Sequence, residues 1–259
     1  SPLPTEGFVW LNEQFGSHAP VYVGSVGTDV CTGLLQGHPI NPVYAGEISA
    51  KCLGVAAYAY DEDGSSVVDE LGELVITEPM PTMPVKFWGD DDMTRYRATY
   101  FEQYPGVMRF GDWVRFTPHN TSVVTGRSDA TLNRGGVRIG TAEIYRQVEK
   151  VAEVLDSIVI GQQWQDDVRV ILFVVLREGL ALDDGLRQRI ASTIKAGATP
   201  RHVPAKIIQI ADIPRTISGK IVELAVANVV HGRAVKNQDA LANPEALRLF
   251  VDIPELALD

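Results

Sequence analysis

The stretch that decides the fold is GRSDATLNRGGVRIGTAE, residues 126–143, which holds three arginines and four glycines. Glycine lets a backbone approach a ligand closely, and the planar guanidinium of arginine matches phosphate oxygens. Judged by composition alone, such a stretch is more often a solvated basic loop. The segments on either side of it decide between these two interpretations.

The chain after residue 143 predicts a compact α+β unit. Thr141 is placed to cap a helix whose buried face is Ile144, Val148 and Val151. Asp183 or Asp184 is placed to cap a second helix that ends at Gly197. Three apolar segments predict strands, at 155–160, 168–176 and 205–210. A loop over 214–220 and a last helix over 221–230 complete this unit.

The chain before residue 126 predicts a β-rich subdomain, since alternating runs between 42 and 77 are separated by turn residues. At 22–29, YVGSVGTD predicts a strand that runs into a glycine loop. The Thr28 hydroxyl and the Asp29 carboxylate would suit a phosphate and its metal ion, although a turn with local hydrogen bonds is the commoner explanation. The acidic triplet 90–92 is interpreted as a solvated loop without function.

Composition excludes several classes of function. The 259 residues are 45% hydrophobic and 22% charged, which is ordinary for a soluble globular protein. A formal net charge of −10 argues against nucleic acid or an anionic membrane as the main partner. The longest strongly apolar run, 168–176, is too short to span a bilayer. Only Cys31 and Cys52 could form disulfides, so we expect a cytoplasmic location.

Five segments, taken in order, resemble the motifs of the adenylate-forming superfamily of acyl-CoA synthetases, nonribosomal adenylation domains and luciferases. They are GTD at 27–29, GEL at 72–74, GD at 111–112, the stretch 126–143, and SGK at 218–220. The resemblance implies an α/β fold of mixed α+β type. Residues 1–128 would be the C-terminal part of the large AMP-binding domain, 129–233 the small lid domain, and 234–259 a tail.

Four further segments resemble the acetoacetyl-CoA synthetases within that superfamily: TLNRGG at 131–136, RHVP at 201–204, FVDIPEL at 250–256 and the proline-containing run 72–84. The likeness implies that acetoacetate, ATP and coenzyme A react through an acyl-adenylate, with Mg²⁺ as cofactor and no nucleic acid or membrane partner. Two alternatives stay open. The chain could serve another short acid, or it could be a non-catalytic fragment that retains half of a site.

The resemblance also implies roles for particular residues. Lys220 would be catalytic and bridge the acyl carboxylate and the α-phosphate, and Asp29 would lie near magnesium. Asp129 would be the hinge between half-reactions. The residues that would bind the nucleotide are Gly27, Thr28, Asp112, Arg127 and Arg138. Those that would lie along coenzyme A are Gly136 and Arg201.

Two departures from the family pattern matter. Many relatives carry an aromatic residue shortly before the threonine for adenine to stack on, whereas this chain has Ser25 and Val26. In addition, no Ser/Thr/Gly-rich phosphate loop with its lysine precedes Gly27, and the chain opens at Ser1 without methionine. We therefore expect this chain to be the later part of an enzyme, to need the N-terminal part of that enzyme, and to be inactive alone.

Overall fold

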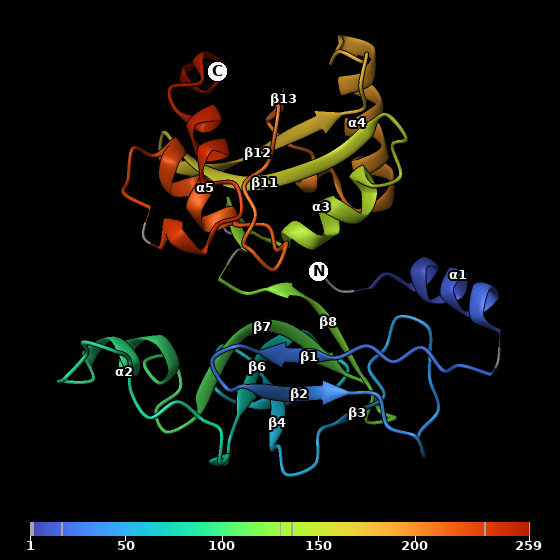
Figure 1. Cartoon of the computed structure of the whole chain (residues 1–259), viewed down its shortest axis with the longest axis vertical. Coiled ribbons are helices and arrows are strands. Elements are labelled where there is room, and N and C mark those ends of the chain that lie inside the picture. Colours follow the sequence, from blue (N-terminus) through green and yellow to red (C-terminus); the bar gives the residue numbers. More distant parts are fainter. Residues whose placement is uncertain (1–2, 17, 130, 136, 236, 259) are drawn as a thin grey trace. The chain divides into compact units, whose positions relative to one another are not determined.

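The computed structural model describes residues 3–16, 18–129, 131–135, 137–235 and 237–258, with backbone only at 133, 137 and 138. The chain divides into two units, Pro2–Asp129 and Ala130–Asp259, and each has its own sheets and core (Figure 1). The fold is of the mixed α/β type that the sequence predicts. Within the described residues, no helix has the length and apolar character needed to cross a membrane.

The first unit is built on a five-stranded antiparallel sheet in the order β5-β4-β6-β7-β8. Its middle strand β6 is buried at every position, as expected for a strand covered on both faces. The strands of this sheet are β4 (Ala57–Tyr60), β5 (Ser66–Val67), β6 (Gly72–Ile76), β7 (Met108–Phe116) and β8 (Ser122–Arg127). A smaller sheet consists of β1 (Ser25–Gly27), β2 (Thr32–Gln36) and β3 (Ala50–Lys51).

Two helices of the first unit lack the usual signals in the sequence. Helix α1 (Thr5–Phe15) begins after Pro4 without a side-chain cap, and Phe8 is its one fully buried residue. Helix α2 (Thr94–Tyr100) begins after Met93, whose backbone is left-handed. The interpretation of 90–92 as a solvated loop is wrong for Asp90, which is 4% exposed. Its carboxylate accepts the backbone N–H groups of Arg95 (3.0 Å) and Tyr96 (2.8 Å), which are free donors in the first turn of α2.

The second unit is built on a three-stranded sheet in the order β11-β12-β13. Strands β11 (Val154–Trp164) and β12 (Asp167–Leu176) form a long antiparallel hairpin with a two-residue turn. Strand β13 (Lys206–Gln209) runs parallel to β12, and helix α4 (Asp184–Gly197) lies between them in the chain. Two antiparallel strands, β9 (Leu132–Arg134) and β10 (Val137–Ile139), form a separate hairpin.

The helix ends of the second unit test the capping predictions. Asp183 caps α4 by accepting the N–H of Leu186 at 2.7 Å, which confirms that prediction. Helix α3 (Thr141–Val148) contains Ile144 and Val148 of the predicted buried face, while Val151 is buried beyond its end. Gly140 occupies the cap position, and Thr141 is already helical. The remaining helix is α5 (Glu223–Val230), and the 3₁₀ turns are η1 (Pro200–His202), η2 (Gln238–Ala240), η3 (Pro244–Phe250) and η4 (Pro254–Ala257).

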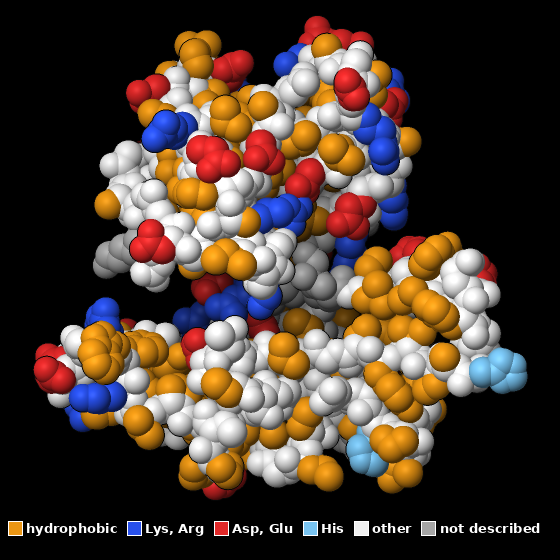
Figure 2. Space-filling view, in the orientation of Figure 1, with side chains coloured by type: hydrophobic (Ala, Val, Ile, Leu, Met, Phe, Trp, Pro, Cys, Tyr) orange, Lys and Arg blue, Asp and Glu red, His pale blue; other side chains and the backbone are white. Residues whose placement is uncertain are grey.

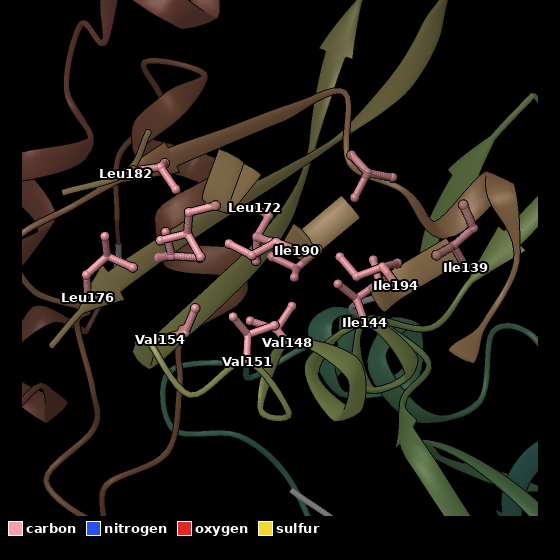
Figure 3. Close-up of a cluster of buried hydrophobic side chains, with 14 of the residues drawn as sticks. Ile139, Ile144, Val148, Val151, Val154, Leu172, Leu176, Leu182, Ile190 and Ile194 are labelled. Carbon is pink, nitrogen blue, oxygen red and sulfur yellow. The ribbon is translucent and has the colours of Figure 1, made fainter. Parts of the chain in front are cut away.

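Side chains that alternate along β11 and β12 build a core on each face of this sheet. Val159 and Leu172 belong to the core on one face, which includes side chains of α3 and α4. Figure 3 shows Leu172 in this cluster with Ile144, Val148 and Ile190. The opposite face packs with α5 and with the C-terminal turns, where the rings of Phe173 and Phe250 meet edge to face at 4.9 Å. The second unit also carries the loop predicted at 214–220, called the lysine loop below because it ends at Lys220.

Candidate nucleotide site and lysine loop

Asp112 and Arg127 face each other on neighbouring strands of the first unit, β7 and β8. The nearest oxygen and nitrogen of the pair, Asp112 Oδ1 and Arg127 Nη1, are 3.8 Å apart. Arg127 makes its closer contacts with Asp129, donating from Nε at 3.0 Å and from Nη2 at 2.6 Å. Ser25 Oγ donates to Asp112 Oδ2 at 3.4 Å. Antiparallel pairing thus collects two carboxylates and a guanidinium at the end of one strand pair.

The surroundings of Asp112 and Arg127 shift the pKa values of both side chains. Burial raises the pKa of Asp112 to about 6, although the positive charge of Arg127 opposes the shift. The hydrogen bond to Asp129 raises the pKa of Arg127 further above its already high value. At neutral pH the site therefore offers an ionised acceptor, which suits hydroxyl donors such as those of a ribose, beside a fixed cation.

The buried side chain of Glu73, on β6, contacts the backbone of β7 beside Asp112. Its side chain is 2% exposed; Oε1 accepts the N–H of Gly111 at 2.8 Å, and Oε2 lies 3.2 Å from Arg109 Nε in an ion pair without hydrogen-bond alignment. Gly111 has a φ of +86°, and a Cβ there would lie 2.9 Å from Arg127 Nη2. Sequence reasoning recognised the GEL and GD segments, but it missed that the Glu73 carboxylate holds the backbone beside Asp112.

The predicted phosphate and metal residues, Thr28 and Asp29, are exposed in the turn that follows β1. As predicted, a strand runs into a turn here, but the strand is short, since β1 covers only Ser25–Gly27. A Cβ at Gly27 would lie 2.4 Å from Cζ of Phe110, so glycine is required there by packing. Asp29 Oδ2 accepts the hydroxyl of Tyr100 at 2.5 Å. Neither aromatic partner was predicted, because no local pattern links them to this turn.

In the second unit, Lys220 ends a tight turn whose base is an antiparallel bridge between Arg215 and Ile221. Thr216 N–H donates to the Lys220 carbonyl at 2.9 Å, and Lys220 N–H donates to Thr216 Oγ1 at 3.0 Å. Gly219 adopts a φ of +81°, which favours glycine. The side chain of Lys220 is exposed, while the backbone that carries it is held on both sides.

Arg215 anchors the lysine loop to the sheet. It donates from Nη1 to the Gly219 carbonyl at 2.7 Å and from Nη2 to Asp156 Oδ2, on β11, at 2.5 Å. A charge-assisted pair of this kind holds the loop base more firmly than a neutral hydrogen bond would. The backbone from which the exposed Lys220 side chain extends is therefore anchored within the second unit.

Known proteins with similar sequence and structure contain the segments that carry the Asp112–Arg127 pair and the lysine loop. No family model matches the chain. The acetoacetyl-coenzyme A synthetase of Rhizobium meliloti (strain 1021) is 54% identical over 256 residues, which cover 99% of this chain and 39% of that protein. The acetoacetyl-CoA synthetase of Rattus norvegicus is 42% identical over 260 residues, covering 99% and 38%. The solved acetoacetyl-CoA synthetase from Streptomyces lividans, 40% identical, matches with a TM-score of 0.88 over 100% of this chain and 40% of that one.

The chain matches the C-terminal portion of the acetoacetyl-CoA synthetases. It has the fold of adenylate-forming acyl-CoA synthetases, as its motifs predict. The chain spans about two-fifths of the length of these relatives, as the coverage of 39% for the Rhizobium protein shows. Gly27, Thr28, Asp29, Asp112, Arg127 and Asp129 lie in its first unit, and Lys220 and Arg201 lie in its second.

The segments that contain the predicted coenzyme A residues Gly136 and Arg201 make contact within the second unit. Arg134, on β9, donates from Nη1 to the carbonyls of Arg201 and Val203, each at 3.1 Å. The Gly135 N–H donates to Asp167 Oδ1 at 2.8 Å, which ties the hairpin to the start of β12. Gly136 lies outside the described residues, and Arg138 is described only as backbone on β10. The described residues 131–135 of one synthetase-like segment thus contact the other, 201–204.

Proposed function

We propose that this chain is the C-terminal portion of an acid–thiol ligase that makes acetoacetyl-CoA from acetoacetate, ATP and coenzyme A. The observation that carries the proposal is the 54% identity to the Rhizobium meliloti synthetase across 99% of the chain. The Asp112–Arg127 pair and the anchored Lys220 loop support it, because both supply groups that an adenylation reaction requires. Such an enzyme would act in the cytoplasm.

In the first half-reaction, an oxygen of the acid's carboxylate forms a bond to the α-phosphorus of ATP. The bond from that phosphorus to the leaving pyrophosphate breaks. Both reactants are anions, so cations and hydrogen-bond donors must offset the charge in the transition state. Lys220 would bridge the carboxylate and the α-phosphate. Thr28 and Arg138 would hold phosphate oxygens, with Gly27 leaving the backbone close to them.

The nucleotide would be oriented by its ribose, with Asp112 accepting the hydroxyls and Arg127 beside it. In the second half-reaction the thiol of coenzyme A attacks the acyl carbon. A carbon–sulfur bond forms, the carbon–oxygen bond to AMP breaks, and the thiol proton passes to solvent. Gly136 and Arg201 would lie along coenzyme A, and Asp129 would be the hinge between the two half-reactions.

A magnesium ion fits this site only together with ATP. The described residues contain no group of three or more His, Cys, Asp or Glu side chains that could hold a metal. Asp29 offers a single exposed carboxylate, and magnesium is commonly held by one or two carboxylates together with substrate phosphates. Asp29 would therefore be the protein ligand, and the ion would neutralise phosphate charge as pyrophosphate leaves.

The test is acid-dependent exchange of labelled pyrophosphate into ATP by the complete polypeptide that includes this chain. A chimera in which this chain replaces the matching portion of the Rhizobium meliloti synthetase provides a second, independently folded background. We expect acetoacetate to support exchange and thioester formation. Butyrate, which lacks the 3-oxo group, should be poorer by about 10⁴-fold in kcat/KM if polar groups recognise that oxygen.

Equal kcat/KM values for butyrate and acetoacetate would contradict the choice of acid and favour a synthetase for another short acid. Absence of exchange with every short acid, in a folded enzyme that binds ATP, would favour the non-catalytic interpretation.

A further inference from the structure

Tyr100 is a buried residue that the function proposed above does not use, although it touches Asp29. Its side chain is 4% exposed, and its hydroxyl donates to Asp29 Oδ2 at 2.5 Å across 71 positions of sequence. Asp29 itself lies in an exposed turn. A hydroxyl of a core residue thus donates to a carboxylate in an exposed turn.

Packing fixes the position of the Tyr100 hydroxyl. The ring centroid of Tyr100 lies 5.4 Å from Tyr96, 5.6 Å from Phe87 and 6.3 Å from Phe101. These rings belong to the core of the first unit. Asp90 secures the start of the same helix by accepting two of its backbone N–H groups. Helix α2 and its aromatic neighbours therefore hold the hydroxyl beside Asp29.

The contact leaves one side of the Asp29 carboxylate available. Within the described part of the chain, Oδ2 accepts the tyrosine and Oδ1 makes no hydrogen bond or ion pair. Magnesium demands near-octahedral geometry at short distances, so a ligand oxygen held in one orientation binds it better than a rotating one. Groups that orient a ligand in this way commonly change metal affinity by about 10- to 100-fold when they are removed.

We propose that Tyr100 is a positioning residue that orients the Asp29 carboxylate for the magnesium ion of bound ATP. The inference rests on the proposed function, since Asp29 meets a magnesium ion only if the chain belongs to an enzyme that binds MgATP. In this proposal, helix α2 places Tyr100 beside the turn after β1 that contains Thr28 and Asp29.

The chain contains a matched control. The ring of Tyr96 belongs to the same aromatic cluster, and its hydroxyl donates to the carbonyl of Pro84 at 2.6 Å. Tyr96→Phe and Tyr100→Phe therefore each remove one hydroxyl and one hydrogen bond from the same helix. They differ in that only Tyr100 reaches Asp29.

The experiment measures the Kd of ATP by calorimetry on the complete enzyme, once with Mg²⁺ and once with a chelator. The gain in affinity that Mg²⁺ provides is the readout. We expect Tyr100→Phe to reduce this gain by about 10- to 100-fold and to leave the metal-free Kd unchanged. Tyr96→Phe should leave both values as in the unaltered enzyme. An equal gain in the two variants would overturn the proposal, and so would a Tyr100→Phe variant whose metal-free binding falls to the same extent.

A double-mutant cycle with Asp29→Asn tests whether Tyr100 acts through Asp29. The gain from Mg²⁺ should be as small in Asp29→Asn/Tyr100→Phe as in Asp29→Asn alone. A further loss in the double variant would show that Tyr100 acts by another route and would contradict the inference. If the unaltered enzyme makes acetoacetyl-CoA while Tyr100→Phe matches Tyr96→Phe, only the assignment of Tyr100 is wrong. If the unaltered enzyme binds no MgATP, the proposed function fails and the inference fails with it.

Discussion

Burial of Asp112 lowers the stability of the folded state when its carboxylate is ionised, which is the form that would accept the hydroxyl groups of a ligand. In the folded chain the pKa of Asp112 is raised from 3.8 to about 6, so the folded state holds the proton more tightly than the unfolded state. The stabilising contribution of this group is therefore fully present below about pH 4 and is lost as pH rises through about 6.

We predict that Asp112→Asn is more stable than the unaltered chain near neutral pH, by up to about 3 kcal/mol, because a shift of one pKa unit corresponds to about 1.4 kcal/mol. The gain should disappear at about pH 4, where Asp112 is protonated. Hydrogen exchange of amides in β7 and β8, measured at both pH values, resolves the effect within the first unit. A variant that is less stable than the unaltered chain near neutral pH would show that the Arg127 contact outweighs burial.

Lys220 is the residue for which we predict the largest kinetic effect. In the complete enzyme, Lys220→Ala should slow acyl-adenylate formation by about 10²- to 10³-fold, the usual effect of losing one well-placed donor. Thioester formation from a supplied acyl-adenylate should change little, since that step breaks no bond to phosphorus. Lys195, exposed on α4, supplies the matched control, and Lys195→Ala should leave both half-reactions unchanged. Pyrophosphate exchange at a near-normal rate in Lys220→Ala would contradict the assigned role.

The chemistry of single residues was predictable only where a motif carried it. Asp112, Arg127 and Lys220 were identified by resemblance, and their roles stay predictions. Glu73 and Tyr100 were out of reach, because each acts on a segment far away in the sequence. Nothing in the residues around position 100 indicates that its hydroxyl meets Asp29.

At the scale of helices and strands, predictions succeeded where local signals agreed. Helix α4 has an aspartate cap, apolar residues at helical spacing and a terminal glycine, and its predicted extent is confirmed. Helix α2 was missed because its cap, Asp90, reaches the first turn from several positions earlier, through a left-handed residue at Met93. The aspartate triplet has the composition of a solvated loop, so its buried member could not be distinguished from its exposed neighbours.

Helix α4 also supports a prediction about stability. Ile190 is completely buried against the sheet, so Ile190→Ala should lower the free energy of unfolding of the second unit by about 2–5 kcal/mol. Leu155 on β11 is 62% exposed, and Leu155→Ala should change the free energy of unfolding by less than about 0.5 kcal/mol. Denaturant unfolding of the chain, with hydrogen exchange to separate the two units, provides the comparison. If Ile190→Ala lowered the free energy of unfolding as little as Leu155→Ala does, the packing of α4 would not stabilise this core.

The chain exposes several large apolar side chains to solvent. Figure 2 shows hydrophobic side chains gathered over α1, where Val9, Trp10 and Phe15 are 48%, 59% and 61% exposed. Exposed apolar patches of this kind promote association. We predict that the 259 residues by themselves self-associate at high concentration, and that Trp10→Ser shifts them toward the monomer in analytical ultracentrifugation. An unaltered chain that stays monomeric at all concentrations would contradict this.

We also predict that the 259 residues alone release no AMP from ATP, magnesium, acetoacetate and coenzyme A. They contain Lys220, Arg127 and Asp112, but the sequence before Gly27 has no glycine-rich loop to restrain the β- and γ-phosphates. Positioning provides most of the catalysis in phosphoryl-type reactions, so an unrestrained leaving group should stall the first step. AMP followed over hours is the measurement. Steady release would show that the phosphate loop is dispensable.

The mixed sheet of the second unit has a consequence for the order in which that unit assembles. Strands β11 and β12 are joined by a two-residue turn, and hairpins of this kind form within about 1–10 μs. The parallel partner β13 must wait until α4 is in place and a long loop has closed, so Ile171 meets Lys206 late. We expect stopped-flow refolding to show early protection of the hairpin amides and a slower phase for β13. Since the lysine loop follows β13 in the chain, the cation on which the proposed chemistry depends would be among the last groups to reach its position.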